Sequence, residues 1–464
     1  MKNPRIVIRC MITENKDLPL TMKPLSYITI FIFFILNSEF LILNSNAQIP
    51  TPAPKQSETI LLLNGIAHLG NGNVIENSAI GFENGKLILV VDATTIRLDK
   101  DKYKKIIEIP GKHVYPGFIS PNSTLGLMEI GAVRATRDMN EVGQMNPNAR
   151  SIIAYNTESK ITSTVRSNGV LLAQITPRGG FISGTSSIVE LDAWNWEDAV
   201  YKMDDGIHLN WPRMFYSTGW WGEPGSMKKN ENRDKQIQKI KLFFDDAKAY
   251  SEIENQQEKD LRFEAMRGLF DGSKSLFIHT NFVKDITSAI NFERESGVKK
   301  TILVGGYDSW MVADMLKEND VAVILRRVHE LPERPEDDID LPFKTPYLLH
   351  KAGVLFCLNN AGDMEQMNTR NLPFYAGTAA AHGLTKEEAL MSITSNAAKI
   401  LGIDDRVGTL ELGKDATLIV STGDALDVLT NNIEHAFIRG RQIDLDNHQK
   451  QLYDKYKKKY STSQ

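Results

Sequence analysis

The sequence has few cysteines, and this scarcity limits how its fold can be stabilised. Cys10 and Cys357 are the only two in 464 residues. Cys10 precedes the start that we predict for the mature chain, so one thiol remains and an internal disulfide is excluded. A hydrophobic core must therefore hold the fold together, and an apolar content of 42% is enough to build one.

The chain also lacks a strong charge of either sign. Lys and Arg number 54 against 58 Asp and Glu, which gives a formal net charge of -4. A mildly acidic protein is not steered electrostatically toward nucleic acid or an anionic membrane. We therefore expect a small-molecule ligand or a protein partner, and no nucleic acid.

Long apolar runs are scarce, and the clearest one lies near the N-terminus, from Leu25 to Leu43. It follows a plausible start at Met22 and precedes the small residues 45–47, which is typical of an export signal cleaved after residue 47. An uncleaved membrane anchor is the alternative, although polar residues 37–39 interrupt the run. We predict that residues 1–47 are a targeting segment and that the protein is exported to the periplasm. Its contact with a membrane would then come through an uncleaved signal.

Short apolar runs separated by Gly and Asn turns occupy both ends of the remaining chain. Asn84 and Gly85 lie between two such runs and predict a tight β-hairpin. Neither end has enough strands to enclose a core alone. We therefore predict that residues 58–113 and 406–445 combine into one small composite β-sandwich built from both termini.

Strand and helix patterns alternate between these ends, which predicts a parallel sheet covered by helices. Residues 181–212 resemble an inserted hairpin, and residues 446–464 form a charged C-terminal tail. The predicted strands cover residues 169–176, 275–279, 301–305, 321–326 and 354–358, and the predicted helices cover 283–296, 309–319 and 386–401.

One stretch, residues 114–127 (VYPGFISPNSTLGL), carries a resemblance to a known family. It reads as an apolar strand that ends in short polar side chains. It resembles the first barrel strand of the amidohydrolase superfamily, in which Pro-Gly and two apolar residues precede an Asp and a His-x-His pair. Ser120 stands here at the Asp position, and Asn122 and Thr124 stand at the two His positions.

Two further segments extend this resemblance, residues 408–417 (GTLELGKDAT) and 394–402 (TSNAAKILG), both similar to imidazolonepropionase-like members. The resemblance implies an α/β fold with a (β/α)8 TIM-like barrel over residues 114–405, next to the composite sandwich. It also implies that the reacting groups lie at the carboxyl ends of the barrel strands.

The family's metal ligands are largely replaced in this chain. His279 matches a metal-ligating histidine, whereas Gly305 and Asn360 stand where a second histidine and the catalytic Asp are expected. One imidazole does not hold a catalytic zinc ion. The resemblance therefore implies His279 as at most one retained ligand, and either no cofactor or a single weakly bound divalent metal such as Zn²⁺. A binuclear centre is not expected.

Two functions remain open at this point. The first is a hydrolase that acts on a carbon-nitrogen bond of a small cyclic amide, in which one metal or none polarises the amide and His279, His329 or Asp363 activates water. The second is a catalytically inactive pseudoenzyme that binds a ligand or acts as a partner subunit, in a homo-oligomer or with a related amidohydrolase. His208 and His329 are expected in loops, with a packing or solvated role as the simpler interpretation. The predicted pocket residues are Asn122, Thr124, Arg178, Asn281, Asn360 and His329.

Overall fold

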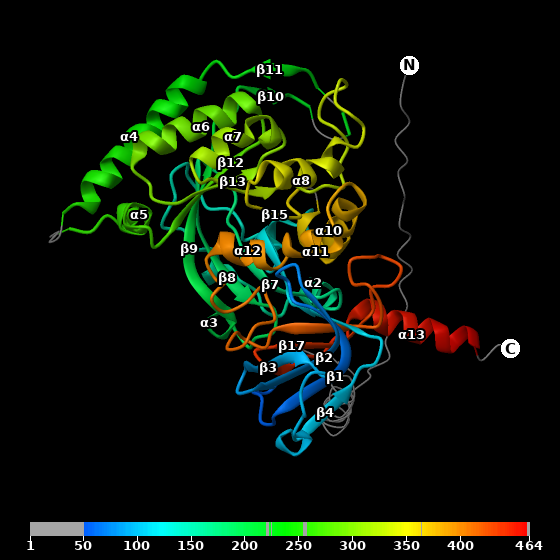
Figure 1. Cartoon of the computed structure of the whole chain (residues 1–464). Coiled ribbons are helices and arrows are strands. Elements are labelled where there is room, and N and C mark those ends of the chain that lie inside the picture. Colours follow the sequence, from blue (N-terminus) through cyan, green and yellow to red (C-terminus); the bar gives the residue numbers. More distant parts are fainter. Residues whose placement is uncertain (1–50, 220–221, 224, 254–257, 363, 462–464) are drawn as a thin grey trace, which may run out of the picture. The chain divides into compact units, whose positions relative to one another are not determined.

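The computed structural model describes residues 51–219, 222–223, 225–253, 258–362 and 364–461 (Figure 1). These residues belong to one compact unit. The predicted targeting segment and Asp363 lie outside the described residues. In the described part of the chain, no helix is both long and apolar enough to cross a membrane.

A sheet of eight strands forms the barrel, in the order β15-β14-β13-β12-β9-β8-β7-β6. Seven strands run in one direction, and β8 is antiparallel to both of its neighbours. Continuous apolar runs such as that of β7 suit strands that are buried on both faces. The strands are β6 (Phe118–Ser123), β7 (Val170–Ile175), β8 (Ile182–Glu190), β9 (Val200–Asn210), β12 (Ser275–Thr280), β13 (Thr301–Gly305), β14 (Ala322–Leu325) and β15 (Phe356–Leu358).

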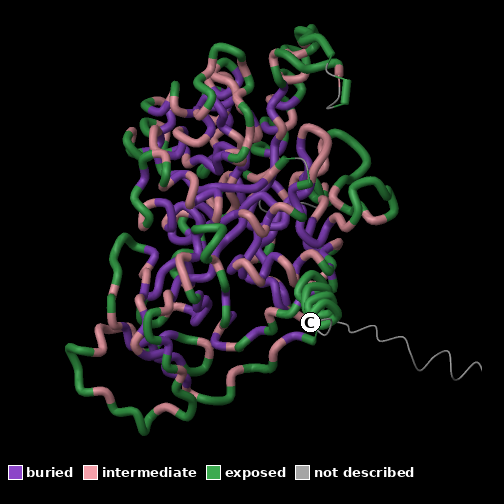
Figure 2. Tube along the Cα trace, turned by 90° about the vertical axis from the view of Figure 1, so that its right-hand side faces the viewer, coloured by how far each residue is buried: buried purple, intermediate pink, exposed green. Residues whose placement is uncertain are grey.

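Helices surround this sheet, and Figure 2 shows the buried residues concentrated inside them. A short two-stranded ribbon, β10 (Phe215–Ser217) with β11 (Met227–Lys229), precedes α4. The helices are α2 (Lys160–Arg166), α3 (Trp196–Ala199), α4 (Arg233–Ser251), α5 (Leu261–Asp271), α6 (Val283–Ser296), α7 (Ala313–Glu318), α8 (Leu341–Ala352), α9 (Glu365–Asn368), α10 (Leu372–Ala381), α11 (Lys386–Met391), α12 (Ser395–Leu401) and α13 (His448–Ser461), with 3-10 turns at Lys100–Lys102, Arg134–Thr136, Ser151–Ala154, Ser309–Val312 and Thr369–Asn371.

The barrel is closed by a helix break rather than by a strand pair between β15 and β6. The Leu358 N–H of β15 donates to the carbonyl of Ser392 at 3.1 Å, and the Ile119 N–H of β6 donates to the carbonyl of Ile393 at 2.9 Å. The prediction of one helix over residues 386–401 is therefore wrong. The helix stops between α11 and α12 because these carbonyls are needed to satisfy strand donors at the seam.

The hairpin predicted at residues 181–212 exists, but its prediction as an insertion is wrong. Its two strands are β8 and β9, the third and fourth strands of the barrel. The (β/α)8 prediction is confirmed as an α/β barrel of eight strands, with one strand reversed. The reversal arises because β8 and β9 are joined directly, through α3, without a crossover that would make them parallel.

The two ends of the chain form a second sheet, which confirms that this unit is built from both termini. Its order is β18-β17-β16-β5-β1-β2-β3, with β4 paired to β1, and β5 joins β16 antiparallel. The rings of Phe82 and Phe437 lie 5.0 Å apart although four strand pairings separate β2 from β17, so the sheet curls around its own core. The strands are β1 (Ile60–His68), β2 (Val74–Glu83), β3 (Lys86–Asp92), β4 (Lys105–Glu108), β5 (His113–Pro116), β16 (Leu418–Ser421), β17 (Ile433–Ile438) and β18 (Arg441–Gln442).

Gly117 is the point where the chain passes from the terminal sheet into the barrel. The stretch read from the sequence as one strand is two: β5 pairs in the terminal sheet and β6 in the barrel. A Cβ on Gly117 would lie 2.8 Å from Leu171 Cδ1, so a larger residue does not fit without movement of β7. The chain therefore crosses from one sheet to the other at a position where there is no room for a side chain.

Buried charges join the barrel base to the terminal sheet. Arg441 of β18 donates to Glu190 at 2.6 Å and to Asp192 at 3.1 Å, and Arg439 also donates to Glu190, at 2.8 Å. Arg166 of α2 forms a second ion pair with Asp192. Burial raises the pKa of Glu190, and the two arginines oppose that shift. Glu190 and Asp192 are thus each held by two guanidinium groups.

Candidate functional site

Asn122 marks the carboxyl end of β6 and has an unusual backbone. Its φ is +49°, a left-handed conformation that Asn tolerates better than most residues. Its N–H donates to Gln174 Oε1 at 3.0 Å, and its carbonyl accepts from Arg178 Nη2 at 2.9 Å. Both neighbours lie on or after β7, so the β6 end is fixed by the adjacent strand.

Arg178 carries the main charge at this mouth and is neutralised there. Its Nη2 lies 3.0 Å from Glu365 Oε1, and the Glu365 side chain is 9% exposed. Asn360, after β15, donates its amide to the Glu365 carbonyl, and Tyr375 donates its hydroxyl to Asn360 Oδ1 at 2.6 Å. Asn360 therefore holds the Glu365 segment and is not placed as a general base.

His279 at the end of β12 faces His208 of β9. His208 Nδ1 and His279 Nε2 are 2.9 Å apart, and the His208 ring stacks on Phe277 with the ring centres 4.6 Å apart. Burial lowers the pKa of His279 to about 3, helped by the positive charges of Arg178 and Arg213. Burial and the neighbouring His279 lower the pKa of His208 well below its usual value. Both imidazoles are therefore neutral near pH 7.

His208 is the residue that the sequence interpretation missed. It lies inside strand β9 and is fully buried, rather than in a loop. The available signal was alternation: Ile207 and Leu209 on either side of it are apolar and pack in the core beneath the outer helices. In a strand, the residue between two outward-facing apolar side chains points to the opposite face, here toward His279.

Several buried polar atoms near these strand ends have no hydrogen-bond partner within the protein. Buried polar groups are normally paired, so a cluster of unpaired ones marks a place where a ligand or water binds. The atoms are Ser120 Oγ, Asn122 Oδ1, Thr124 Oγ1, His208 Nε2 and Asn281 Oδ1.

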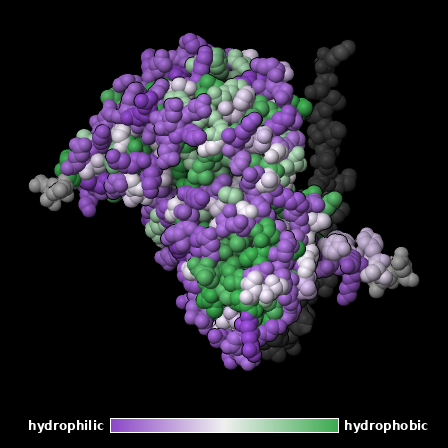
Figure 3. All heavy atoms as spheres, in the orientation of Figure 1, coloured by the Kyte–Doolittle hydropathy of each residue, from purple (hydrophilic) through white to green (hydrophobic). Residues whose placement is uncertain are grey.

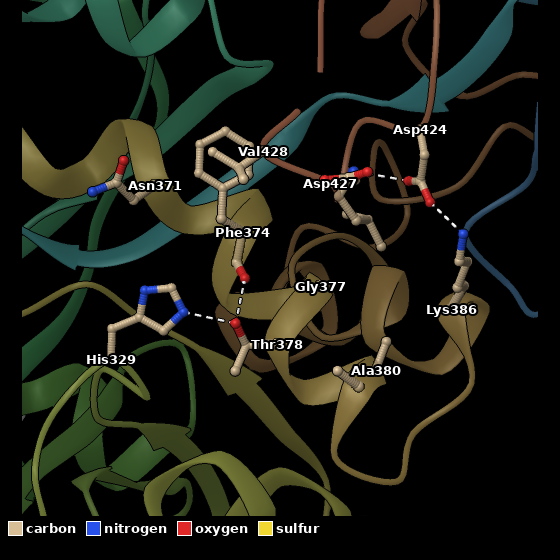
Figure 4. A pocket seen from close by; sticks show the side chains of 12 residues that line it. His329, Asn371, Phe374, Gly377, Thr378, Ala380, Lys386, Asp424, Asp427 and Val428 are labelled. Carbon is tan, nitrogen blue, oxygen red and sulfur yellow. Dashed lines mark hydrogen bonds and ion pairs between the residues drawn. The ribbon is translucent and has the colours of Figure 1, made fainter. Parts of the chain in front are cut away.

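His329 does not join this cluster. Its Nε2 contacts Thr378 Oγ1 at 2.7 Å in a cavity of about 600 Å³ between α10 and the segment 424–428 (Figure 4). Its link to the mouth is indirect: its ring contacts the ring of Tyr375, 4.6 Å away, which in turn bonds Asn360.

The side chains at the mouth do not fit the binuclear metal centre of the resembled family. Among the described residues, no group of three or more His, Cys, Asp and Glu is arranged to hold a metal. Gly305 has a φ of +103°, and a Cβ there would lie 2.5 Å from Asn281 Oδ1, so a ligand side chain at this position would be strained. Two neutral imidazoles beside amide and hydroxyl groups make a weak donor set for Zn²⁺.

A family model matches part of the chain. Residues 348–443, from within α8 to the end of the terminal sheet, are similar to the amidohydrolase family. The matched part includes the eighth barrel strand and β16 to β18, and the strand ends that carry His208 and His279 lie outside it.

Solved structures show the same fold. An amidohydrolase from Thermotoga maritima MSB8 is similar with a TM-score of 0.71 and 23% identity, covering 83% of this chain and 99% of the other. A Xaa-Pro dipeptidase with methionine bound in its active site has a TM-score of 0.52 and 13% identity, covering 83% and 100%. Among curated proteins, none is significantly similar in sequence to this chain.

Proposed function

We propose that this amidohydrolase-fold protein binds a small, uncharged, amide-type ligand at the barrel mouth and does not activate water on a metal pair. The observation that carries this proposal is the set of buried polar atoms without protein partners at the ends of β6, β9 and β12, the last two of which carry the His208–His279 pair. Arg178 is already paired with Glu365, and the two histidines are neutral. A neutral ligand therefore suits this mouth better than an anion or a cation.

The chemistry of the unpaired atoms supports an amide. An amide offers one acceptor and one or two donors, and the mouth offers asparagine carbonyl oxygens as acceptors and hydroxyl groups that act as either. Each buried polar atom left unpaired costs about 1–3 kcal/mol, so a ligand that pairs several of them gains affinity by removing that cost. A cyclic imide or hydantoin presents such groups on a compact, rigid ring.

Catalysis by a metal-bound hydroxide needs about three protein ligands. The described mouth supplies two imidazoles that point at each other. We therefore expect no tightly bound metal pair, and at most one weak divalent ion with His279 as its retained ligand.

A second candidate function is hydrolysis of a carbon-nitrogen bond of the same ligand, which is the reaction class of the superfamily. The His208–His279 pair favours it, because a neutral imidazole within hydrogen-bond reach of a water can accept a proton. The low pKa of His279 makes it a weak base, so we expect slow turnover at best.

The location and partners belong to the same proposal. An export signal over residues 1–47 would place the protein in the periplasm, where a second copy or a related amidohydrolase could assemble with it. N-terminal sequencing of the exported chain should find Gln48 first, and light scattering of the purified protein would measure its assembly.

Binding is tested by calorimetric titration of hydantoin, dihydrouracil and succinimide. We expect one of them to bind the wild type, and His279→Gln to weaken that binding by about tenfold or more, the cost of one or two lost hydrogen bonds. His435→Gln is the matched control, because His435 lies on β17 of the terminal sheet. Equal affinities for both variants would place the ligand elsewhere.

Elemental analysis and a hydrolysis assay separate the two candidate functions. Fewer than one metal equivalent per chain and no turnover support the binding protein. Two equivalents of zinc or manganese, with turnover that a chelator abolishes, would overturn it and establish a metal-dependent hydrolase.

A further inference from the structure

Helix α13 is the most basic element of the chain and has no buried residue. Five Lys and one Asp over residues 448–461 give it a net charge of +4, whereas the whole chain carries -4, so the remainder carries -8. The low net charge of the protein is thus the sum of a basic helix and an acidic remainder.

The apolar side chains of α13 lie on one stripe. At 3.6 residues per turn, Leu452, Tyr453, Tyr456 and Tyr460 fall within an arc of about 100°. They are 37%, 64%, 49% and 64% exposed, so the body of the protein does not cover them.

Lysines border this stripe on both sides. Lys457 lies next to its Tyr453 edge, with the Lys457 Nζ 5.6 Å from the Tyr453 ring centre, and Lys459 lies next to its Leu452 edge, with the Lys459 Nζ 5.2 Å from the Tyr460 ring centre. Lys455 adds a further cation near Tyr456 at 6.0 Å. Aromatic rings that have a polar tip, flanked by long cationic side chains, are the composition of a helix that lies in a membrane interface.

The attachment of α13 leaves most of its length available. Asn447 Oδ1 accepts from the Lys450 N–H at the helix start, and Thr164 of α2 donates to Gln449 at 2.8 Å. These contacts involve the first turn, and the described remainder of α13 is exposed in Figure 2 and lies at the edge of the molecule in Figure 3.

We propose that α13 docks on an anionic phospholipid surface, with its tyrosine stripe at the headgroup level and its lysines against the lipid phosphates. Charge complementarity selects this occupant: the helix is basic, lipid phosphates are anionic, and the headgroup boundary also accommodates a stripe of one leucine and three tyrosines. The docking is independent of the barrel mouth and of what the mouth binds.

Vesicle co-sedimentation tests this proposal in the chain that starts at Gln48, which keeps the whole compact unit and omits the apolar run 25–43. We expect binding to vesicles containing phosphatidylglycerol, none to pure phosphatidylcholine, and a steep loss with added salt. Lys455→Glu with Lys459→Glu should weaken binding at least about tenfold, since each lysine near the surface contributes about fivefold.

Two further variants separate helix docking from general electrostatics. Lys235→Glu with Lys239→Glu on α4 changes the charge equally at the same spacing, at exposed sites, and should leave vesicle binding unchanged. Tyr453→Ser with Tyr456→Ser keeps every charge and should also weaken binding. Equal loss in the α4 control, no loss in either α13 variant, or co-sedimentation that follows self-association in light scattering would overturn the proposal.

Discussion

The two ends of the barrel handle buried polar groups in opposite ways. At the base, Glu190 and Asp192 are each held by two arginines, and these ion pairs join barrel to terminal sheet. At the mouth, Asn122, Thr124 and His208 each keep a buried atom without a protein partner. Both regions are polar and enclosed, so burial alone does not distinguish them.

The difference teaches how to separate structural from functional polar groups. Buried charges that are fully paired stabilise an arrangement and have no free hydrogen-bonding capacity for a ligand. Buried polar groups without a partner cost stability in the free protein and are retained where something else pairs them. The mouth of this barrel has polar groups of the second kind.

Removing an arginine from the ion pairs at the barrel base should have the largest effect on stability. Arg441→Met leaves Glu190 and Asp192 each with one guanidinium fewer in a buried site, and we expect a loss of about 3–5 kcal/mol in the free energy of unfolding. Urea denaturation measures it. Arg262→Met, an exposed pair with Asp260, is the control and should cost less than about 1 kcal/mol. A small loss of unfolding free energy in Arg441→Met would show that these ion pairs do not stabilise the junction between barrel and terminal sheet.

The buried titratable groups at the mouth should make the free energy of unfolding depend on pH. The folded pKa of His279 is about 3, below its usual 6.5, so between these values the unfolded chain binds more protons and stability falls as the pH falls through 6.5. From pH 7 to pH 5 we expect this histidine to cost about 2 kcal/mol. Asp205 acts in the opposite direction, because burial raises its pKa to about 6 and the folded state then holds its proton more tightly.

Because these two effects oppose each other, the comparison of variants is more informative than the wild-type curve. His279→Gln should remove about 2 kcal/mol of the decline toward pH 5. Parallel pH curves for wild type and His279→Gln would mean that His279 takes up a proton in the folded protein as readily as in the unfolded chain.

Removing an unsaturated side chain should change binding more than stability. Asn122→Gly keeps the left-handed backbone that glycine also adopts, so we expect unfolding to change by less than about 1 kcal/mol. Ligand affinity should fall about tenfold. Asn84→Gly is matched, since Asn84 has φ +50° in the β2–β3 turn, and it should leave affinity unchanged. Calorimetry of both variants checks this; a large loss of stability at Asn122 would place it with the base residues.

The smallest effect is expected at Thr378. Thr378→Val removes the contact with His329 in the cavity beside α10, and we expect a change of a few tenths of a kcal/mol in the free energy of unfolding because the site is partly exposed. Affinity at the mouth should not change. A measurable loss of mouth binding would instead show that this cavity and the mouth act as one site.

Most of the fold was predictable from local patterns in the sequence. The predicted strand 301–305 and helix 283–296 agree with β13 and α6, because their apolar periodicity is strong and their ends are marked by glycine. The Asn84–Gly85 turn was also predictable, and both residues have positive φ as a two-residue hairpin requires. Each of these features depends on residues that are close in sequence.

Features that depend on distant residues were not predictable. The direction of β8 leaves no trace in its composition, and the break between α11 and α12 follows from donors on β6 and β15. The same holds for the site. His279 was predicted from its place at the end of a strand, whereas the contact of His208 with it depends on the pairing of β9 with β12. Asp363, one of the residues predicted to activate water, lies outside the described residues.

The reversed strand β8 has a consequence for how such a barrel can evolve. A strand that runs the other way brings its amino end to the mouth and its carboxyl end, with Glu190, to the base. The carboxyl end of β8 therefore contributes no side chain to the mouth and instead binds the neighbouring sheet through Glu190. Selection on β8 should act through folding and attachment, while the seven remaining strand ends stay free to change their ligand.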